Sequence, residues 1–203
     1  MPDGPLSLPA RLCLLAWDAD PSRQAPVVRA GALAALARRG LLADDDGIAT
    51  PLDLDSRTGD AVLDGLLELV TESRPHRWRV WVTLHARYTL DAVREQLVAE
   101  GVLRAEKHRV LGLFPSVEHV LSDARRFRSL RREAGDVLAG PPETVAEPTA
   151  TTLTLALAAG LLPPPSPSRA EALAHRATTV SPAYEAILQE LRAALTATTL
   201  SGV

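Results

Sequence analysis

Glycine and proline divide this chain into short segments with helical periodicity, and this punctuation constrains the fold more than any other feature of the sequence. Over residues 27–39, small and aliphatic side chains recur at the spacing of one helix face, and Gly40 follows where that helix would end. Comparable apolar segments precede Gly101 and Gly160. Because short amphipathic helices bury their apolar faces only against one another, the pattern predicts a mainly α fold.

Most other segments carry signals for the start or the end of a helix. Polar side chains that can accept the free N–H groups of a first turn precede several apolar periodic segments. The expected starts are Thr58-Gly59-Asp60, Thr89 (ending at Gly101), Ser122 (ending before Pro141), a point near Thr149, Ser168 with a capping-box Glu171, and Ser181-Pro182. Residues 163–167 are expected to form a stiff, exposed connector.

Extended structure is expected in only a few places. Residues 110–114 suggest a strand stopped by Pro115, whereas residues 78–82 are too few to separate a strand from a helix. Segments 36–42 and 97–103 resemble each other, since both show the end of a helix, a glycine, two aliphatic residues and then an extended stretch. This pattern is typical of the end of a winged helix and suggests two similar subdomains packed in one globule.

Length and composition indicate a single globular protein. With 203 residues, of which 46% are apolar and 23% charged, the chain can build the core of one or at most two domains. We expect a core domain over residues 1–162, with a proline-rich connector and C-terminal helices over residues 163–203 packing on it. There is no membrane-spanning apolar run and no signal-peptide pattern, so a cytoplasmic location is expected. The single Cys13 lies in an apolar segment and is expected to be buried.

Common catalytic and metal-binding motifs are missing from the sequence. It contains neither a phosphate-binding glycine loop nor the H-E-x-x-H and G-x-S-x-G motifs. Its histidines match no common zinc spacing, although His108 and His119 could approach each other across a turn. We therefore expect no catalytic residue, no cofactor and no metal site, and a chain that is not an enzyme.

The basic residues are unusual in kind and in position. Of the 22 basic residues, only Lys107 is a lysine. A GC-rich genome explains this bias; the alternative is selection for the guanidinium group, which binds phosphate and carboxylate through two hydrogen bonds. The densest run is residues 125–132, in which Arg125, Arg128 and Arg132 would share one helix face. That strip is either a solvated helix face or an anion-binding, membrane-facing surface.

Six segments, in order along the chain, resemble one known family. They are residues 12–18 (LCLLAWD), 31–40 (GALAALARRG), 58–64 (TGDAVLD), 93–103 (VREQLVAEGVL), 111–115 (LGLFP) and the leucine- and alanine-rich stretch 148–162. Taken together, they resemble the Golgi phosphoprotein 3 family over most of the chain.

The resemblance implies both a fold and a function. The fold would be a single helical domain with a central helix bundle, surrounding amphipathic helices and small β-hairpins. The function would be that of a peripheral membrane protein, because eukaryotic members bind phosphatidylinositol 4-phosphate in a shallow basic pocket. The arginine-rich composition suggests a bacterial member. The family's oligomerising hairpin would fall after Leu162, where this chain is proline-rich and then helical, so the family's tetramer is not expected.

The resemblance also implies which residues bind the headgroup. Arg29 matches the arginine of the family's pocket, and Arg87 matches the first residue of a basic pair. Leu90 takes the place of the second, for which Arg94, one turn further on, can substitute. The pocket's tryptophan has no counterpart, since the segment around Asp20 is shorter. The expected headgroup-binding residues are therefore Arg29, Arg87 and Arg94.

The leading hypothesis is a non-catalytic protein that binds anionic or phosphoinositide headgroups at the inner face of the membrane, with membrane-associated proteins as further partners. The alternative is a winged-helix regulator that binds nucleic acid, against which the net charge of −3 and the few aromatic residues argue. An enzyme or small-molecule sensor and a protein-binding adaptor are the remaining hypotheses, and no motif favours either.

Overall fold

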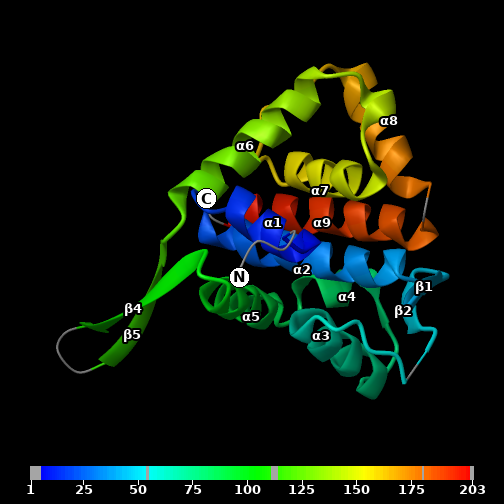
Figure 1. The fold of residues 1–203 in the computed structure, drawn as a ribbon. Helices are drawn as coiled ribbons and strands as arrows, with labels where there is room; N and C mark the ends of the chain where they lie inside the picture. Colours follow the sequence, from blue (N-terminus) through cyan, green and yellow to red (C-terminus); the bar gives the residue numbers. More distant parts are fainter. Residues whose placement is uncertain (1–5, 54, 111–113, 180, 202–203) are drawn as a thin grey trace.

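Helices dominate the computed structural model, which describes residues 6–53, 55–110, 114–179 and 181–201. Figure 1 shows them packed around one another, and the predicted mainly α fold is confirmed. The described helices are α1 (Leu8–Leu15), α2 (Pro21–Arg38), α3 (Ala61–Glu72), α4 (Trp78–Thr83), α5 (Ala86–Ala99), α6 (Ala124–Ala139), the 3-10 helix η1 (Pro142–Thr144), α7 (Glu147–Ala158), α8 (Pro167–Thr178) and α9 (Pro182–Ser201). The strands are β1 (Leu42–Asp45), β2 (Ile48–Pro51), β3 (His76–Arg77), β4 (Leu103–Val110) and β5 (Phe114–Leu121).

Helix α2 is the central element. Every residue from Val27 to Ala37 is buried, and α1, α3, α4, α5, α7 and α9 all pack against this helix. It begins at Pro21, six residues earlier than the periodicity predicts, because the Asp20 carboxylate accepts the backbone N–H of Ser22 at 2.8 Å and caps the first turn. Apolar periodicity alone therefore misses this polar first turn.

Three helices end as the glycine signals predict. Gly40, Gly101 and Gly160 have φ values of +70°, +73° and +66°, a conformation that glycine adopts without steric cost. After each glycine the next backbone N–H turns back to the carbonyl five residues before it: Leu41 to Leu36, Val102 to Leu97, and Leu161 to Ala156. The helix–glycine–hairpin pattern predicted twice is also present twice, as α2–β1–β2 and α5–β4–β5.

The predicted helix starts are less accurate than the ends. Asp60 caps α3 as expected, accepting the N–H groups of Val62 and Leu63. The prediction that Thr89 begins a helix is wrong, because α5 begins at Ala86 and buries Thr89 inside it. The cap of α6 is Asp123 rather than Ser122. Ser168 lies within α8, whose first turn has no side-chain cap. Residues 78–82 are helical and belong to α4.

The hairpin β4–β5 extends away from the helices (Figure 1). The prediction of one strand over residues 110–114 is wrong: Val110 ends β4, Phe114 begins β5, and the two residues pair at the far end of the ladder. Residues 111–113 lie outside the described residues. Pro115 sits inside β5 opposite Arg109, which a two-stranded ladder tolerates because each strand has a free edge.

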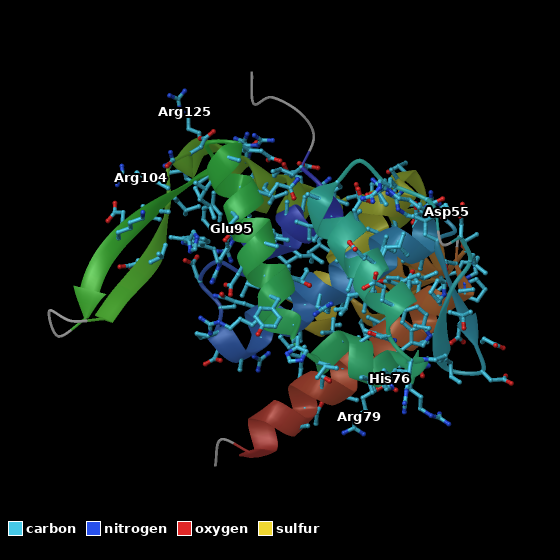
Figure 2. All side chains as sticks on the ribbon, turned by 90° about the horizontal axis from the view of Figure 1, so that it is seen from below. Asp55, His76, Arg79, Glu95, Arg104 and Arg125 are labelled. Atoms are coloured by element: carbon cyan, nitrogen blue, oxygen red, sulfur yellow. The ribbon has the colours of Figure 1, made fainter. Side chains whose placement is uncertain are left out.

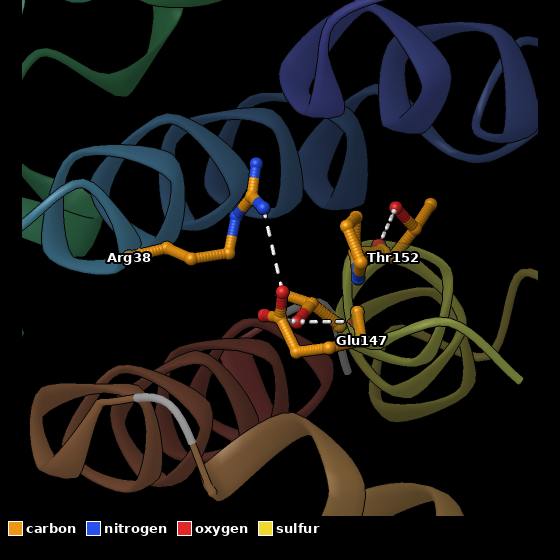
Figure 3. A network of polar contacts seen from close by, with 5 residues as sticks. Arg38, Glu147 and Thr152 are labelled. Atoms are coloured by element: carbon orange, nitrogen blue, oxygen red, sulfur yellow. Dashed lines mark hydrogen bonds and ion pairs between the residues drawn. The ribbon is translucent and has the colours of Figure 1, made fainter.

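Helix α7 is buried on almost all sides, since every residue from Ala150 to Ala156 is buried. Its buried threonines donate their hydroxyls to carbonyls one turn back, for example Thr154 to Ala150 at 2.8 Å. At its first residue, Glu147 accepts a hydrogen bond from Arg38 at the last turn of α2, 3.3 Å away (Figure 3). A carboxylate at a helix start and a guanidinium at a helix end both oppose the partial charges of the helix dipoles.

The C-terminal helices complete the same core. Leu173 of α8 and Tyr184, Ile187 and Leu191 of α9 belong to the apolar cluster formed by α1 to α7. Helix α9 packs along α2 and α4.

Candidate functional site

The junction between α4 and α5 is where the structure places two of the three arginines expected to bind a headgroup, Arg29 and Arg87. Leu84 ends α4 and His85, with φ of 53°, starts α5 in the left-handed conformation. No side chain caps the first turn of α5, and no acidic residue lies in that turn. The N–H of Tyr88 donates to the carbonyl of His85 at 3.0 Å, and the positive end of the helix dipole is not opposed by an acidic side chain in the first turn.

Arg29 supports this junction from the interior. Its side chain is only 1% exposed, and Nη2 donates to the carbonyl oxygens of Leu84 (3.1 Å) and His85 (2.8 Å). No ion pair is formed with a carboxylate among the described residues. Burial lowers the pKa of Arg29 to about 10, which still leaves the guanidinium charged at neutral pH. The structure thus places Arg29 beneath the surface, at the end of α4.

Arg87 is the exposed basic residue of the junction. Its side chain is 78% exposed, and its Nε lies 3.8 Å from the carboxylate of Asp91 one turn along α5. A pair this open and this long contributes little to stability. Arg87 is therefore free to turn toward an external anion.

Arg94 has a different environment from Arg87. It lies two turns further along α5, its side chain is 20% exposed, and Nη2 donates to Oε1 of Gln24 on α2 at 2.6 Å. Gln24 in turn donates to the carbonyl of Ala19, so Arg94 ties α5 to the turn that precedes α2. Leu90, at the other position of the expected basic pair, is buried. Arg29 and Arg87 lie at the start of α5 and Arg94 lies two turns along it, and the three expected arginines do not share an exposed surface.

Two exposed apolar side chains flank Arg87. Leu84 is 45% exposed and Tyr88 is 71% exposed, and the Tyr88 ring stacks on His85 with 5.3 Å between ring centroids. Sequence periodicity did not single out either residue. Tyr88 lies in the first turn of α5, whose start was predicted three residues too late, and Leu84 lies in the turn between α4 and α5, which the sequence pattern did not place.

The arginine strip of α6 is present on the surface of the protein. Leu130 is buried beneath it while Arg125, Arg128 and Arg132 are exposed, as predicted from the helical spacing. Figure 2 shows Arg125 pointing away from the body of the protein. Nε of Arg128 donates to the carbonyl of Ala124 in its own helix at 3.2 Å.

Two acidic side chains near the strip pair with arginines other than Arg125, Arg128 and Arg132, while the exposed Asp136 follows Arg132 by one turn. Glu133 pairs with Arg11 of α1 at 2.8 Å, and Asp18 pairs with Arg131 at 2.8 Å. Arg125 and Arg132 form no ion pair within the described part of the chain. The strip therefore keeps a local excess of positive charge although the whole chain has a net charge of −3.

Comparison with known proteins places the chain in a family. The family model for Golgi phosphoprotein 3 (GPP34) matches residues 8–198, nearly the whole chain. The protein belongs to the GPP34 family. No curated protein sequence matches it significantly.

The GPP34 motif at the start of α3 has a structural explanation. Thr58 donates its backbone N–H and its hydroxyl to Oδ1 of Asp64, at 2.6 and 2.7 Å, while Asp60 caps the helix. These hydrogen bonds lower the pKa of the Asp64 carboxyl. Residues 58–64 therefore form the start of α3, and the side chains of Thr58, Asp60 and Asp64 are already hydrogen-bonded there.

A groove of about 450 Å³ separates α5 of this GPP34 protein from its β4–β5 hairpin. Arg87 and Lys107 line it together with two carboxylates, Asp91 and Glu95. His119 lies on the same wall, and its pKa is lowered by burial and by the nearby Arg94. Positive and negative side chains balance here, so the groove offers no net attraction to an anion.

The remaining candidate groups have ordinary structural environments. Burial raises the pKa of the Cys13 thiol to about 11, so the thiol stays protonated at neutral pH, and the expected burial of Cys13 is confirmed. In the backbone register of the hairpin, His108 lies opposite Ser116 and His119 lies opposite Ala105. Among the described residues, no three potential metal-binding side chains come together. None of the described helices combines the length and apolarity needed to cross a bilayer.

Proposed function

We propose that this GPP34 protein is a non-catalytic peripheral protein that binds the surface of anionic membranes through the α4–α5 junction. The observation that carries the proposal is the position of Arg87, which lies fully accessible at the uncapped start of α5 between the exposed Leu84 and Tyr88. Lipid binding is known for the family in general.

Each part of the junction suits one layer of a membrane surface. The uncapped N-terminus of α5 and the Arg87 guanidinium attract lipid phosphates. Tyrosine side chains favour the boundary between headgroups and acyl chains, since the ring is apolar and the hydroxyl polar. Tyr88 and Leu84 would enter that boundary beside Arg87, and the α6 strip would add a second basic contact.

Vesicle co-sedimentation tests the proposal. We expect the protein to bind vesicles that contain phosphatidylglycerol and not vesicles of phosphatidylcholine alone, with binding that decreases as salt is added. Arg87→Ala should weaken binding about fivefold, because one surface arginine contributes about 1 kcal/mol near an anionic bilayer.

Arg192→Ala is the matched control, since it removes an exposed arginine from α9 and changes the net charge equally. The proposal fails if the folded protein binds no anionic vesicle at low salt. Equal losses for the Arg87 and Arg192 variants would show that the junction is not the contact.

A nucleic-acid-binding function is the second candidate, because a hairpin follows α5 as a wing follows a recognition helix. The outer face of α5 argues against it, since Asp91, Glu95 and Glu100 would face the phosphates. Fluorescence anisotropy with duplex DNA should therefore show no binding at physiological salt, and steeply salt-dependent binding would favour this function instead.

A further inference from the structure

Two sets of arginines bear on which lipids this protein can distinguish. This inference rests on the proposed membrane function. One set, the interior group, is buried or partly buried and donates to carbonyl or amide oxygens, and the other is exposed on the outer faces of helices.

The interior group ties helix ends together. Arg29 donates to the carbonyls at the end of α4, Arg23 donates to the carbonyl of Ala159 at the end of α7 (3.0 Å), and Arg169 donates to the carbonyl of Leu138 in the last turn of α6 (3.0 Å). Carbonyls at a helix end lack partners within the helix and carry partial negative charge. These guanidiniums are therefore used for packing.

Arg29 and Arg94 are the decisive members of this group. Nη2 of Arg29 already holds two carbonyl oxygens, and Nη2 of Arg94 holds the amide oxygen of the buried Gln24 at 2.6 Å. Arg29 is also only 1% exposed, and Nη1 of Arg94 lies 3.8 Å from the carboxylate of Asp91. Neither arginine therefore presents an open, unpaired guanidinium to a headgroup. Leu90, which takes the place of the second residue of the family's basic pair, is buried, and its side chain has no hydrogen-bond donor.

Stereospecific recognition of a phosphorylated headgroup needs several donors that converge on one concave site. The exposed basic residues include Arg87 at the junction and Arg125, Arg128 and Arg132 on α6, where Arg131 is also exposed but pairs with Asp18. The strip residues lie along the outer face of one helix, and the groove that Arg87 lines also contains Asp91 and Glu95. These side chains can contact a charged plane, but they cannot surround one inositol phosphate.

We infer that membrane binding by this protein depends on the negative charge density of the bilayer rather than on the identity of a phosphoinositide headgroup. The ligand class is then any anionic glycerophospholipid surface. Each exposed arginine adds a similar increment, about fivefold in partitioning, and salt reduces all the increments together.

The test compares two lipids at equal surface charge. Vesicles of phosphatidylcholine receive either phosphatidylglycerol or phosphatidylinositol 4-phosphate, in amounts adjusted until their measured zeta potentials match. We expect partition coefficients that agree within about threefold, since charge is the only quantity sensed. A preference of about tenfold or more for the phosphoinositide vesicles would overturn the inference and leave the proposed membrane function standing. Binding to neither kind of vesicle would reject the membrane function itself.

Two variants sharpen the comparison because all their substitutions are on exposed side chains. For each variant, Arg87→Ala and the triple variant Arg125→Ala/Arg128→Ala/Arg132→Ala, the factor by which partitioning falls should be the same on phosphatidylglycerol vesicles as on phosphoinositide vesicles. The triple variant should lose more than the single one. Circular dichroism verifies that each variant is folded. A variant that loses phosphoinositide binding selectively would identify a headgroup pocket and contradict the inference.

Discussion

At the scale of single residues, Arg29 is the most unusual group in the protein. A buried cation without a carboxylate partner is costly, and this one is retained because it satisfies the carbonyls of Leu84 and His85 at a helix junction. Its Nε has no hydrogen-bond partner among the described residues. The side chain therefore combines a structural role with a position directly beneath the proposed membrane contact.

Replacing Arg29 tests how much its hydrogen bonds to the α4–α5 junction contribute to stability. Arg29→Met keeps most of the buried volume but removes the donor to the carbonyl of Leu84 and one of the two donors to the carbonyl of His85, which also accepts from the N–H of Tyr88, so we expect the free energy of unfolding to fall by about 1–3 kcal/mol. Arg29→Lys should restore part of it, because the ammonium can still donate to one carbonyl. Urea unfolding monitored by circular dichroism measures both. Equal stability of the methionine variant and the native protein would contradict the assigned role.

The raised pKa of Cys13 predicts that the stability of the protein depends on pH. Its folded pKa of about 11 exceeds the ordinary value of 9.0, so the unfolded chain loses this proton first as the pH rises. The stability that Cys13 contributes is thus complete below pH 9.0 and is lost as the pH rises toward about 11. We expect the native protein to lose stability over this range more steeply than Cys13→Ala does. Urea titrations at a series of pH values measure the difference, and parallel curves would contradict the prediction.

At the scale of elements, Gly31 is tightly packed within its helix, whereas Gly65 and Gly135 have open space where a Cβ would lie. A Cβ added to Gly31 of α2 would come within 2.4 Å of Leu12 Cδ1 and 2.8 Å of Leu8 Cδ2, whereas one added to Gly65 or Gly135 would meet nothing within 4 Å. Gly31 therefore allows α1 to approach α2 closely. No contact explains the other two glycines.

Alanine substitutions test this difference. Gly65→Ala and Gly135→Ala should each stabilise the protein by about 0.5–1 kcal/mol, because alanine favours the helix and fits without contact. Gly31→Ala should destabilise it by about 1–3 kcal/mol, since the packed side chains of Leu8 and Leu12 must shift to make room for the methyl group. Thermal or urea unfolding reports all three changes. A stabilising Gly31→Ala would show that α1 packs less tightly on α2 than the structure indicates.

The sequence was a better guide to helix ends than to helix starts, for a physical reason. Gly40, Gly101 and Gly160 are local signals, because only their own backbone conformation is needed to end a helix. The start of α5 depends on a distant group: Arg29, 56 residues from His85, holds the carbonyl of His85. Neither a capping side chain nor a glycine marks that position. No local pattern could therefore have placed the junction correctly.

At the scale of the whole molecule, the position of the arginines matters more than their number. The net charge of −3 averages over arginines that fix helix ends and arginines that face outward. The sequence predicted the exposed strip of α6 correctly from helical spacing. It could not show that Arg29 and Arg94 are engaged internally, because their partners Leu84, His85 and Gln24 are far from them along the chain.

The central claim is that the α4–α5 junction meets an anionic membrane. The most direct test attaches an environment-sensitive fluorophore at position 88, using Tyr88→Cys in a Cys13→Ala background, with Arg192→Cys as the matched control on α9. Phosphatidylglycerol vesicles should shift the emission of the probe at position 88 to the blue and leave the probe at position 192 unchanged, and phosphatidylcholine vesicles should change neither. An unchanged probe at position 88 on vesicle-bound protein would contradict the account.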